Sequence, residues 1–576
     1  MANLSFAQTL NWKARISYRT FFIALSAGLV FLLPWLSRDF GITWDEWMDS
    51  NNGLLALRYV LSLGRDKEVL NFWHGIYYPH FFYSVVGMAY GLLFNALSAV
   101  LQNGLHTDTH LIRFYTTSHA INALFGAVAM VYTGLLAKRL AGWRAGCLAL
   151  ILIAVSPRFF GNAMNNPKDI PFAAAGIFFL YYLTVFLQEQ PQPRKRTCLL
   201  LACGIAASLG TRAGGLIQMA YLFLFSAWLV FEARFLKTGL ALSLPRLTLT
   251  VALIAIAGYL GGLLFWPYGW ENPIAHPLKA LHEVSRISFW EGLIVFEGHS
   301  FSAKVLPWYY IPKWILISSP LAVIGGLLFL LLLWRPVLKN TGSRLAGPLL
   351  FAAIFPVAYV IYQKSVLLDS WRHLLFVYPP WVVLSVLGWE AVLREVNSTG
   401  KRLFVAAILI LQIAQPFSWM IRNHPHAYVY FNPLVGGING AFARYETDYW
   451  GNSLRGCAEW LAAYHQQNSP LQPAYVRADG SVMSSYPFLK QALGDFYRPY
   501  GYPPEFLAKD PYFFIQYAPY MGGDQSWNYA LVLSRGWKPE ILRSAAWPPE
   551  GTIHEIQADD VTLCAVVKNP RTTLHV

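Results

Sequence analysis

The chain has 576 residues, of which 56% are hydrophobic and only 13% are charged, and its mean hydropathy is +0.39. Because a soluble protein carries about 25% charged residues, this composition excludes an ordinary soluble enzyme and predicts many membrane-spanning helices. The formal net charge of +14 lies in short segments between apolar runs, so it indicates membrane topology and gives no reason to invoke a nucleic-acid partner.

The apolar runs, taken in chain order, predict about eleven transmembrane helices. The first follows the basic residues Lys13, Arg15 and Arg19, and since no small-residue cleavage site follows it, we expect a retained signal anchor. Many of the runs are close to the length that a helix needs to cross the hydrocarbon core, and several are short or broken by Gly and Pro. The predicted spans lie near residues 20–37, 114–136, 145–157, 171–188, 197–210, 213–231, 247–266, 312–334, 346–362, 373–389 and 403–421.

The basic residues between these spans predict the orientation of the chain. With a cytoplasmic N-terminus, the cytoplasmic segments hold 18 lysines and arginines against four acids, as the positive-inside rule requires. The sequence therefore predicts an integral membrane protein with its N-terminus in the cytoplasm. The basic residues form six clusters, which are Lys13/Arg15/Arg19, Lys138/Arg139/Arg144, Arg194/Lys195/Arg196, Arg234/Lys237/Arg246, Arg335/Lys339/Arg344 and Arg394/Lys401/Arg402.

Two further regions are expected outside the membrane. Residues 80–103 are apolar and long enough to span, but counting them would place every later basic cluster outside, so we expect a re-entrant or interfacial helix within an external loop 38–112. The tail is more polar and shows one amphipathic-helix pattern and two strand patterns. The sequence thus predicts a transmembrane domain, 1–421, and a small extracytoplasmic (periplasmic) α/β domain, 422–576, for which a Cys457–Cys564 disulfide is an open alternative.

Acidic, basic and aromatic residues gather on the predicted external side, next to the ends of spans. Asp45 and Glu46 follow the first span, "NNPKDIP" carries Lys168 and Asp169 before the fourth, and Arg212 lies in the turn after the fifth. Further motifs on this side are "WPYGWENP", "PWYYIP" and "LLDSWRH". Segments far apart in the chain therefore bring acids, bases and aromatic rings to one membrane boundary.

This combination suits the transfer of a sugar from a polyprenyl phosphate. Cations stabilise the departing phosphate, and the acceptor hydroxyl needs a single carboxylate as general base. A glycosidase needs two opposed carboxyl groups at a fixed separation, which adjacent residues do not supply. Simpler roles are also open: Thr43 to Glu46 matches a capping box, and Trp44 and Lys168 suit interfacial anchors.

At these residues the sequence resembles the GT-C membrane glycosyltransferases, and within them the protein O-mannosyltransferases and the lipid A aminoarabinose transferases. The matching motifs keep the family's order along most of the chain: "TWDE", "RFYTTSHAINALFGAVAMVYTGLLAKRLAG", "VSPRFFGNAMNNPKDIPFAAAGIFF", "LLDSWRHLLFVYPP" and "FNPLVGGINGAFARYETDYWG". The resemblance implies a GT-C-like polytopic fold and, because the last two motifs are similar to those of a bacterial subgroup, a place in a bacterial inner membrane. It also implies inverting transfer from a polyprenyl-phosphate sugar to a hydroxyl of a protein, lipid or glycan acceptor.

The resemblance also implies roles for single residues. Asp45 would be the catalytic base, Glu46 would help to organise the acceptor, and Asp169 matches a second acidic position. For the substrate-binding residues we expect basic and aromatic side chains on the same side, which are Lys168, Arg158, Arg212, Arg372, His373, His80, Trp44 and Tyr309. The chain departs from the family in reading "YYPHFF" where members often have His-Pro-Pro, so the role of His80 is the weakest of these.

No tight spacing of histidines or carboxylates predicts a metal site, so no metal ligand is assigned and a divalent cation stays an open alternative. Two other functions suit a polytopic chain: a transporter or flippase of lipid-linked sugar, and a scaffold that acts through its tail. Transporters usually show internal repeats and charges near the midplane, whereas this sequence shows no evident repeat and gathers its charges at one boundary. The sequence therefore favours a glycosyltransferase.

Overall fold

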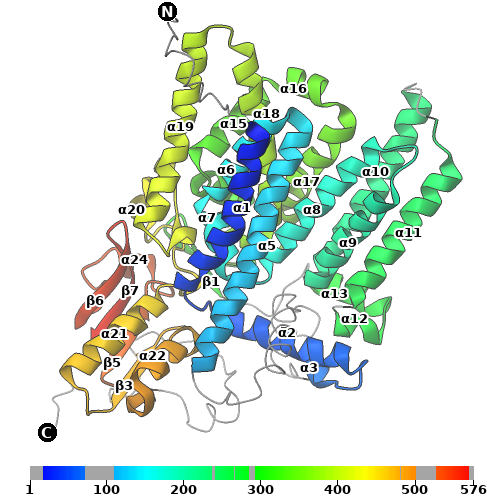
Figure 1. The fold of residues 1–576 in the computed structure, drawn as a ribbon. Helices are drawn as coiled ribbons and strands as arrows, with labels where there is room; N and C mark the ends of the chain where they lie inside the picture. The colour runs from blue at the N-terminus through cyan, green and yellow to red at the C-terminus, as the bar shows by residue number, and fades with distance from the viewer. Residues whose placement is uncertain are drawn as a thin grey trace, which may run out of the picture.

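The computed structural model describes residues 17–71, 109–236, 241–264, 266–284, 292–480, 482–500 and 527–569. A bundle of long helices makes up most of it, and a small β-sheet domain lies at one end of the bundle, close to helix α2 (Glu46–Leu61) (Figure 1). The predicted interfacial stretch 80–103 lies outside the described residues.

Within the described ranges, eight helices are long and apolar enough to cross a membrane. Two further candidate spans are broken pairs: α6 and α7 meet at a 68° bend, and α14 and α15 at a 119° bend. The eight are α1 (Tyr18–Leu36), α5 (Thr109–Ala141), α8 (Asp169–Gln188), α10 (Leu216–Phe235), α11 (Leu244–Leu263), α17 (Ser343–Tyr362), α18 (Tyr378–Glu395) and α19 (Thr399–Arg422). The broken pairs are α6 (Trp143–Ala154) with α7 (Pro157–Asn165) and α14 (Tyr310–Ser318) with α15 (Leu321–Leu332).

The predicted polytopic helical fold is confirmed, and the difference from about eleven spans lies at residues 197–210. The helix there, α9 (Lys195–Thr211), has 17 residues, at the lower limit for a span. It packs against α8 and α11. Close approach to α11 requires glycine, because a Cβ at Gly258 or Gly262 would lie 2.7 Å from side-chain carbons of α9.

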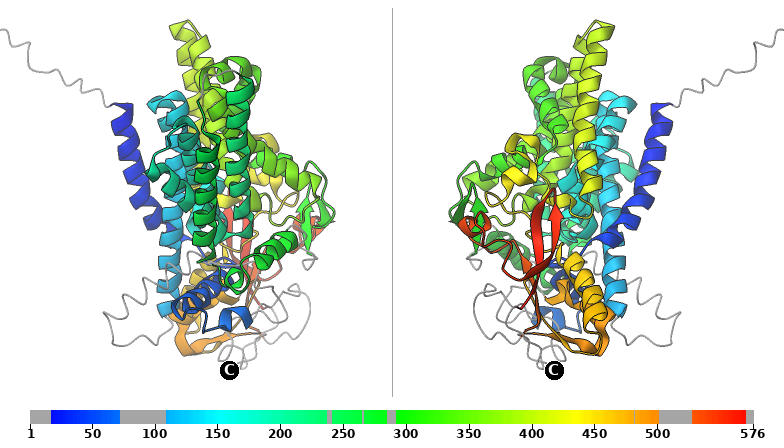
Figure 2. Two further views of the ribbon diagram at one scale, coloured as in Figure 1. Left: turned by 90° about the vertical axis from the view of Figure 1, so that its right-hand side faces the viewer. Right: turned by 90° about the vertical axis from the view of Figure 1, so that its left-hand side faces the viewer.

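The burial of the helices fits a membrane environment. Large apolar side chains such as Phe31 on α1, Leu249 on α11 and Ile410 on α19 are exposed, as lipid-facing positions must be, while α8 and α18 have 78% of their spans buried inside the bundle. Helices need no partner for their backbone groups in lipid. The chain is therefore an integral membrane protein, and α8 and α18 lie in the interior of its bundle. Figure 2 shows the bundle from two further sides, with the red strands of the C-terminal domain near its lower end.

Shorter elements connect the spans on the side of α2. They are α3 (Glu68–Asn71), α12 (Pro267–Glu271), α13 (Ala275–Val284), the antiparallel hairpin β1 (Leu293–Phe296) and β2 (His299–Ser302), and the 3-10 helix η3 (Arg372–Val377). Elsewhere lie α16 (Trp334–Thr341), α20 (Gly437–Ala441) and α24 (Pro539–Leu542).

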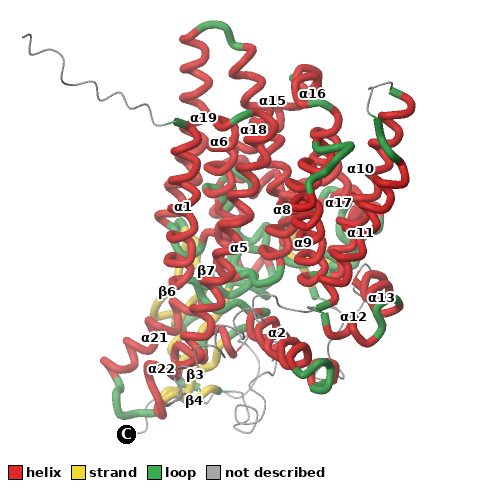
Figure 3. Tube along the Cα trace, turned by 45° about the vertical axis from the view of Figure 1, so that its right-hand side comes forward, coloured by secondary structure: helices red, strands yellow, loops and turns green. Residues whose placement is uncertain are grey.

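The C-terminal domain is built on a five-stranded mixed sheet of order β4-β3-β5-β7-β6, which lies at the lower end of the helices in Figure 3. β4 and β5 run parallel to β3, and β7 runs antiparallel to both β5 and β6. The strands and main helices are β3 (Ala474–Ala478), β4 (Tyr497–Pro499), β5 (Tyr529–Leu533), β6 (Thr552–Ala558), β7 (Val561–Lys568), α21 (Leu454–Asn468) and α22 (Tyr486–Leu493). The amphipathic helix predicted in the tail corresponds to α21, and the two predicted strands correspond to β5 and β7, so all three predictions are confirmed.

The core of this domain explains its uninterrupted apolar strands. Every residue of β5 is buried, because α21 and α22 cover one face of the sheet while Trp527, Trp537 and Trp547 cover the other. Cys457 of α21 and Cys564 of β7 are buried free thiols whose side chains contact each other.

Polar contacts fasten the C-terminal domain to the bundle. At the end of α19, Trp419 Nε1 and Asn423 Nδ2 donate to the Asp559 carboxylate over 2.6 and 2.9 Å, and Asp559 N donates to Asn423 Oδ1 over 2.8 Å. Near the first span, Gly41 N donates to Asn452 Oδ1 over 2.8 Å. These contacts place the domain next to residues 41–49.

Candidate active site

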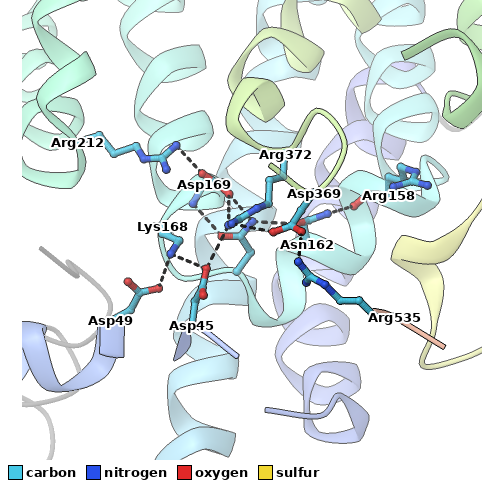
Figure 4. A network of polar contacts seen from close by, with 11 residues as sticks. Asp45, Asp49, Arg158, Asn162, Lys168, Asp169, Arg212, Asp369, Arg372 and Arg535 are labelled. Carbon is cyan, nitrogen blue, oxygen red and sulfur yellow. Dashed lines mark hydrogen bonds and ion pairs between the residues drawn. The ribbon is translucent and has the colours of Figure 1, made fainter. Parts of the chain in front are cut away.

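Charged side chains from four separate segments meet where the C-terminal domain joins the bundle (Figure 4). They come from the start of α2, the break between α7 and α8, the end of α9 and the loop that leads into η3. The basic turns of the opposite bundle end, between α5 and α6 and between α18 and α19, lie far from this cluster (Figure 1).

The "NNPKDIP" segment forms a side-chain turn that starts α8. Asp169 N donates to Asn166 Oδ1 over 3.0 Å, and Asn166 Nδ2 donates to Asp169 Oδ2 over 2.9 Å. Pro171 falls in the first turn of the helix, where its missing N–H is harmless. This turn points Lys168 toward α2.

Lys168 joins two carboxylates of α2. Its Nζ lies 2.8 Å from Asp45 Oδ2 and 3.4 Å from Asp49 Oδ2. The two acids are four residues apart and therefore share one helix face. Asp45 is 22% exposed at its side chain, whereas Lys168 and Asp49 are buried. Sequence reasoning missed Asp49, although the D-x-x-x-D spacing was a signal for it.

Arg372 is the centre of the second half of the cluster. Its Nη1 lies 3.3 Å from Asp45 Oδ2 and 3.9 Å from Asp169 Oδ2, and its Nη2 lies 3.0 Å from Asp369 Oδ2. The guanidinium also stacks over the ring of Trp450, 5.1 Å from its centroid. Arg212 Nη1 binds Asp169 Oδ1 at 2.6 Å. The structure thus brings together Asp45, Lys168, Asp169, Arg212 and Arg372, as expected.

The charges act on the two acids of α2 in opposite ways. Burial alone would raise the pKa of Asp45, but Lys168, Arg372 and Arg535 outweigh it and hold that pKa well below its usual value. Burial raises the pKa of Asp49 to about 6, helped by the negative charges of Asp45 and Asp169 and opposed by Lys168. Asp45 is therefore ionised beside these cations.

Glu46 points away from this cluster. Its Oε2 accepts a hydrogen bond from Thr43 N over 2.6 Å, and its Oε1 lies 2.6 Å from His119 Nε2. Glu46 is 1% exposed. Glu46 therefore ties back the start of α2, which is half of the predicted capping box. The other half is not formed, because the Thr43 hydroxyl has no hydrogen-bond partner among the described residues. Asp45 and Glu46 diverge around the helix, as adjacent residues must.

The remaining predicted residues lie in different places. Trp44 lies under Arg535, whose Cζ is 4.6 Å from its ring centroid, and half-buried His373 lies among the charges of Arg372, Arg212, Asp169 and Lys168. Arg158 points elsewhere: its Nε donates to Tyr430 O, and its guanidinium stacks on Trp314 and Phe431. Tyr309 donates to Glu297 over 3.0 Å, and His80 lies outside the described residues.

Besides Asp49, two further residues of the cluster were not anticipated. Asp369 stands inside the quoted motif "LLDSWRH" but was not singled out, and Arg535 of the C-terminal domain binds it at 2.7 Å. Nothing local in the sequence marks Arg535, because its partner is 166 residues away. Across the described ranges, no group of three or more His, Cys, Asp or Glu side chains is placed to hold a metal ion.

Comparison with known proteins supports the resemblance of the sequence to membrane mannosyltransferases. Residues 116–261 match the family described as dolichyl-phosphate-mannose-protein mannosyltransferase. This segment runs from α5 into α11 and contains Lys168, Asp169 and Arg212. No curated protein sequence matches the chain.

Solved structures of membrane glycosyltransferases align over much of the chain. ArnT from Cupriavidus metallidurans is 13% identical to this chain in both of its structures. The alignment with the apo state covers 96% of this chain and 98% of ArnT, with a TM-score of 0.47. The alignment with the structure bound to undecaprenyl phosphate covers 97% of this chain and 99% of ArnT, with a TM-score of 0.43. The oligosaccharyltransferase AglB from Archaeoglobus fulgidus, in complex with an inhibitory peptide and a dolichol-phosphate, is 14% identical over 83% of this chain and 63% of that one, with a TM-score of 0.45. Likeness at this level says nothing about the chemistry of the present site.

Proposed function

We propose that this chain is a membrane glycosyltransferase that uses a polyprenyl-phosphate-linked sugar, with Asp45 as the general base on the extracytoplasmic side. The match of residues 116–261 to the dolichyl-phosphate-mannose-protein mannosyltransferase family supports this proposal. The observation that carries the proposal is the pairing of a partly exposed carboxylate, Asp45, with two cations, Lys168 and Arg372, at one end of the bundle. A base and a phosphate site within one side-chain length is what sugar transfer from a lipid phosphate requires.

The cations supply the phosphate site. Lys168, Arg212 and Arg372 surround Asp45 and Asp169, and Arg212 and Asp45 keep 23% and 22% of their side chains exposed. A phosphate entering here would exchange carboxylate partners for its own oxygens and would gain charge-assisted hydrogen bonds. His373 lies beside these cations. Arg158, also expected among the substrate-binding residues, contacts Tyr430, Trp314 and Phe431 instead.

A small apolar cavity next to the cations gives the direction in which we place the polyprenyl chain. Its lining includes Phe172 and Gly176 of α8, Phe376 of η3 and Pro380 of α18. Its volume of about 20 Å³ has room for about one water molecule, so the surrounding side chains would have to move apart to admit a lipid tail. Phe172 follows Asp169 by three residues and Phe376 follows Arg372 by four, so the cavity begins about one helical turn from the phosphate site. A lipid with its phosphate on the cations would place its tail in this direction.

The reaction follows from these positions. The acceptor oxygen attacks the anomeric carbon while the bond from that carbon to the phosphate oxygen breaks, and the hydroxyl proton passes to Asp45. The phosphate leaves with the electron pair and keeps its negative charge on Lys168 and Arg372. Attack opposite the leaving phosphate inverts the anomeric centre. A donor phosphate that occupies both cations also removes the charges that hold the pKa of Asp45 low, so the carboxylate becomes a better base once the donor is bound.

The orientation is supported by the positive-inside rule. The basic turns that follow α5 and precede α19 lie at the bundle end opposite to Asp45 (Figure 1), and such turns normally face the cytoplasm. A protein that transfers sugar there would have its C-terminal domain on the extracytoplasmic side, where the acceptor would be a protein, lipid or glycan hydroxyl.

The test combines lipid identification with a turnover assay. Mass spectrometry of lipid that copurifies with the full-length protein is expected to detect a polyprenyl-phosphate sugar or polyprenyl phosphate. Incubation of that donor with the protein in vesicles is expected to release polyprenyl phosphate and a glycosylated acceptor. Uptake of the donor into vesicles with its glycosidic bond intact would instead assign a transporter and contradict the proposal.

A further inference from the structure

The C-terminal domain contributes a charged side chain to the cluster around Asp45. Arg535 follows β5, and its Nη2 lies 2.7 Å from Asp369 Oδ1. The other carboxylate oxygen of Asp369 lies 3.0 Å from Arg372 Nη2. Asp369 therefore shares its charge between an arginine of the bundle and an arginine of the C-terminal domain (Figure 4).

The backbone holds Asp369 in an uncommon conformation. Asp369 and Ser370 have φ values of 53° and 67°, a region in which few non-glycine residues are found. Two such residues in succession persist only where the surrounding contacts over-determine them, and both are buried, at 5% and 2% exposure. The loop thus fixes the carboxylate between the two arginines.

Arg535 is itself held from its other side. Its guanidinium lies over the ring of Trp44, with Cζ 4.6 Å from the ring centroid, a cation–π arrangement. Two glycines of the C-terminal segment enclose this ring: a Cβ at Gly480 or Gly451 would lie 2.4 or 2.6 Å from Trp44 Nε1. Arg535 therefore has little freedom to leave Asp369.

The position of Asp369 matters for a phosphate that binds Arg372. Arg372 already faces Asp45 and Asp169, at 3.3 and 3.9 Å, so Asp369 is its third carboxylate neighbour. A phosphate brought to Arg372 meets the negative charge of Asp369 at close range, and like charges in a buried site repel strongly. Arg535 is the cation that offsets this charge without itself contacting Arg372.

We propose that Arg535 is a positioning residue for the donor phosphate, because it neutralises Asp369 and so leaves Arg372 able to bind an anion. The inference rests on the proposed function and extends it: the C-terminal domain would be part of the donor site. The ligand group that this site would bind at Arg372 is a monoanionic or dianionic phosphate.

The experiment measures binding of undecaprenyl phosphate to the full-length protein in detergent, without turnover. Arg535→Gln is expected to raise the Kd about tenfold, since Asp369 then draws on the charge of Arg372 without a second cation to share it. Arg535→Lys keeps the positive charge but gives up the stacking on Trp44, so its Kd is expected to lie between those of the wild type and Arg535→Gln. The exposed Arg498 of the same domain supplies the matched control, and Arg498→Gln is expected to leave the Kd unchanged.

A double variant separates this role from a merely structural one. In Asp369→Asn/Arg535→Gln the repulsive charge is gone as well, so the Kd is expected to return to within about threefold of the wild type. A double variant that binds no better than Arg535→Gln alone would overturn the inference. Arg372→Met tests the proposed function separately. If this variant binds undecaprenyl phosphate as the wild type does, the phosphate site lies elsewhere. If it loses binding while Arg535→Gln binds normally, only the role of Arg535 is overturned.

Discussion

Asp45→Asn separates base chemistry from phosphate binding. The Asp45 carboxylate lies 2.8 Å from Lys168 Nζ and 3.3 Å from Arg372 Nη1. Asparagine keeps the shape of the side chain but cannot take the acceptor proton, and it removes a negative charge from beside both cations. We therefore expect sugar transfer to fall while binding of the lipid phosphate becomes tighter.

The contacts set the size of both effects. A positioned general base contributes roughly 10²–10⁴-fold, so kcat is expected to fall by at least about 100-fold. At an effective dielectric constant near 20, the ion pairs of Asp45 with Lys168 and Arg372 are worth at most about 6 and about 5 kcal/mol. In Asp45→Asn only part of this energy is gained when the lipid phosphate binds, because Lys168 is still paired with Asp49 and Arg372 is still paired with Asp369. The Kd of polyprenyl phosphate is thus expected to fall about tenfold, or about 1.4 kcal/mol.

The assay needs single-turnover transfer and equilibrium binding on the same preparations. Asp39→Asn is the matched control, because Asp39 precedes the same loop, is 52% exposed and contacts His424 at 2.8 Å outside the cluster. Its transfer rate and Kd are expected to match the wild type. Wild-type transfer by Asp45→Asn, or weaker phosphate binding by it, would refute the assigned role.

Three further substitutions test the surroundings of the site. Asp49 carries a pKa of about 6, above its unfolded value, so its ionisation destabilises the fold as pH rises from about 4 to 6. Asp49→Asn is therefore expected to raise the Tm at pH 8, by the equivalent of about 1–3 kcal/mol, and to lose this advantage near pH 4; equal Tm values at pH 8 would contradict the burial of this charge. Arg212→Met leaves Asp169, 2% exposed, with Arg372 at 3.9 Å, and is expected to lower unfolding free energy by about 1–3 kcal/mol, measured by thermal unfolding in detergent. Gly480→Val adds a Cβ 2.4 Å from Trp44 Nε1 at a φ of 83°, so Trp44 must move, and loss of both Tm and transfer activity is expected; unchanged activity would show that Trp44 is not needed in this place.

The sequence alone was sufficient for the fold class and for part of the site. Hydropathy and charge are local properties, so the spans and the basic turns could be predicted without any contact information. The broken helices α6–α7 and α14–α15 were predicted only as short or interrupted spans, because a bend depends on the neighbouring helices as well as on Pro157 and Pro320. Asp45, Lys168 and Asp169 were found because each stands at the end of an apolar run.

Tertiary structure decided how these charges are paired. Both Asp45 and Glu46 follow the first span, yet one meets Lys168 and Arg372 while the other caps α2 and binds His119. Arg372 is 327 residues from Asp45, and no local pattern encodes a contact over that distance. Hydropathy acts on each segment by itself, whereas ion pairing depends on where separate segments end in space, and only the packed bundle with its C-terminal domain determines that.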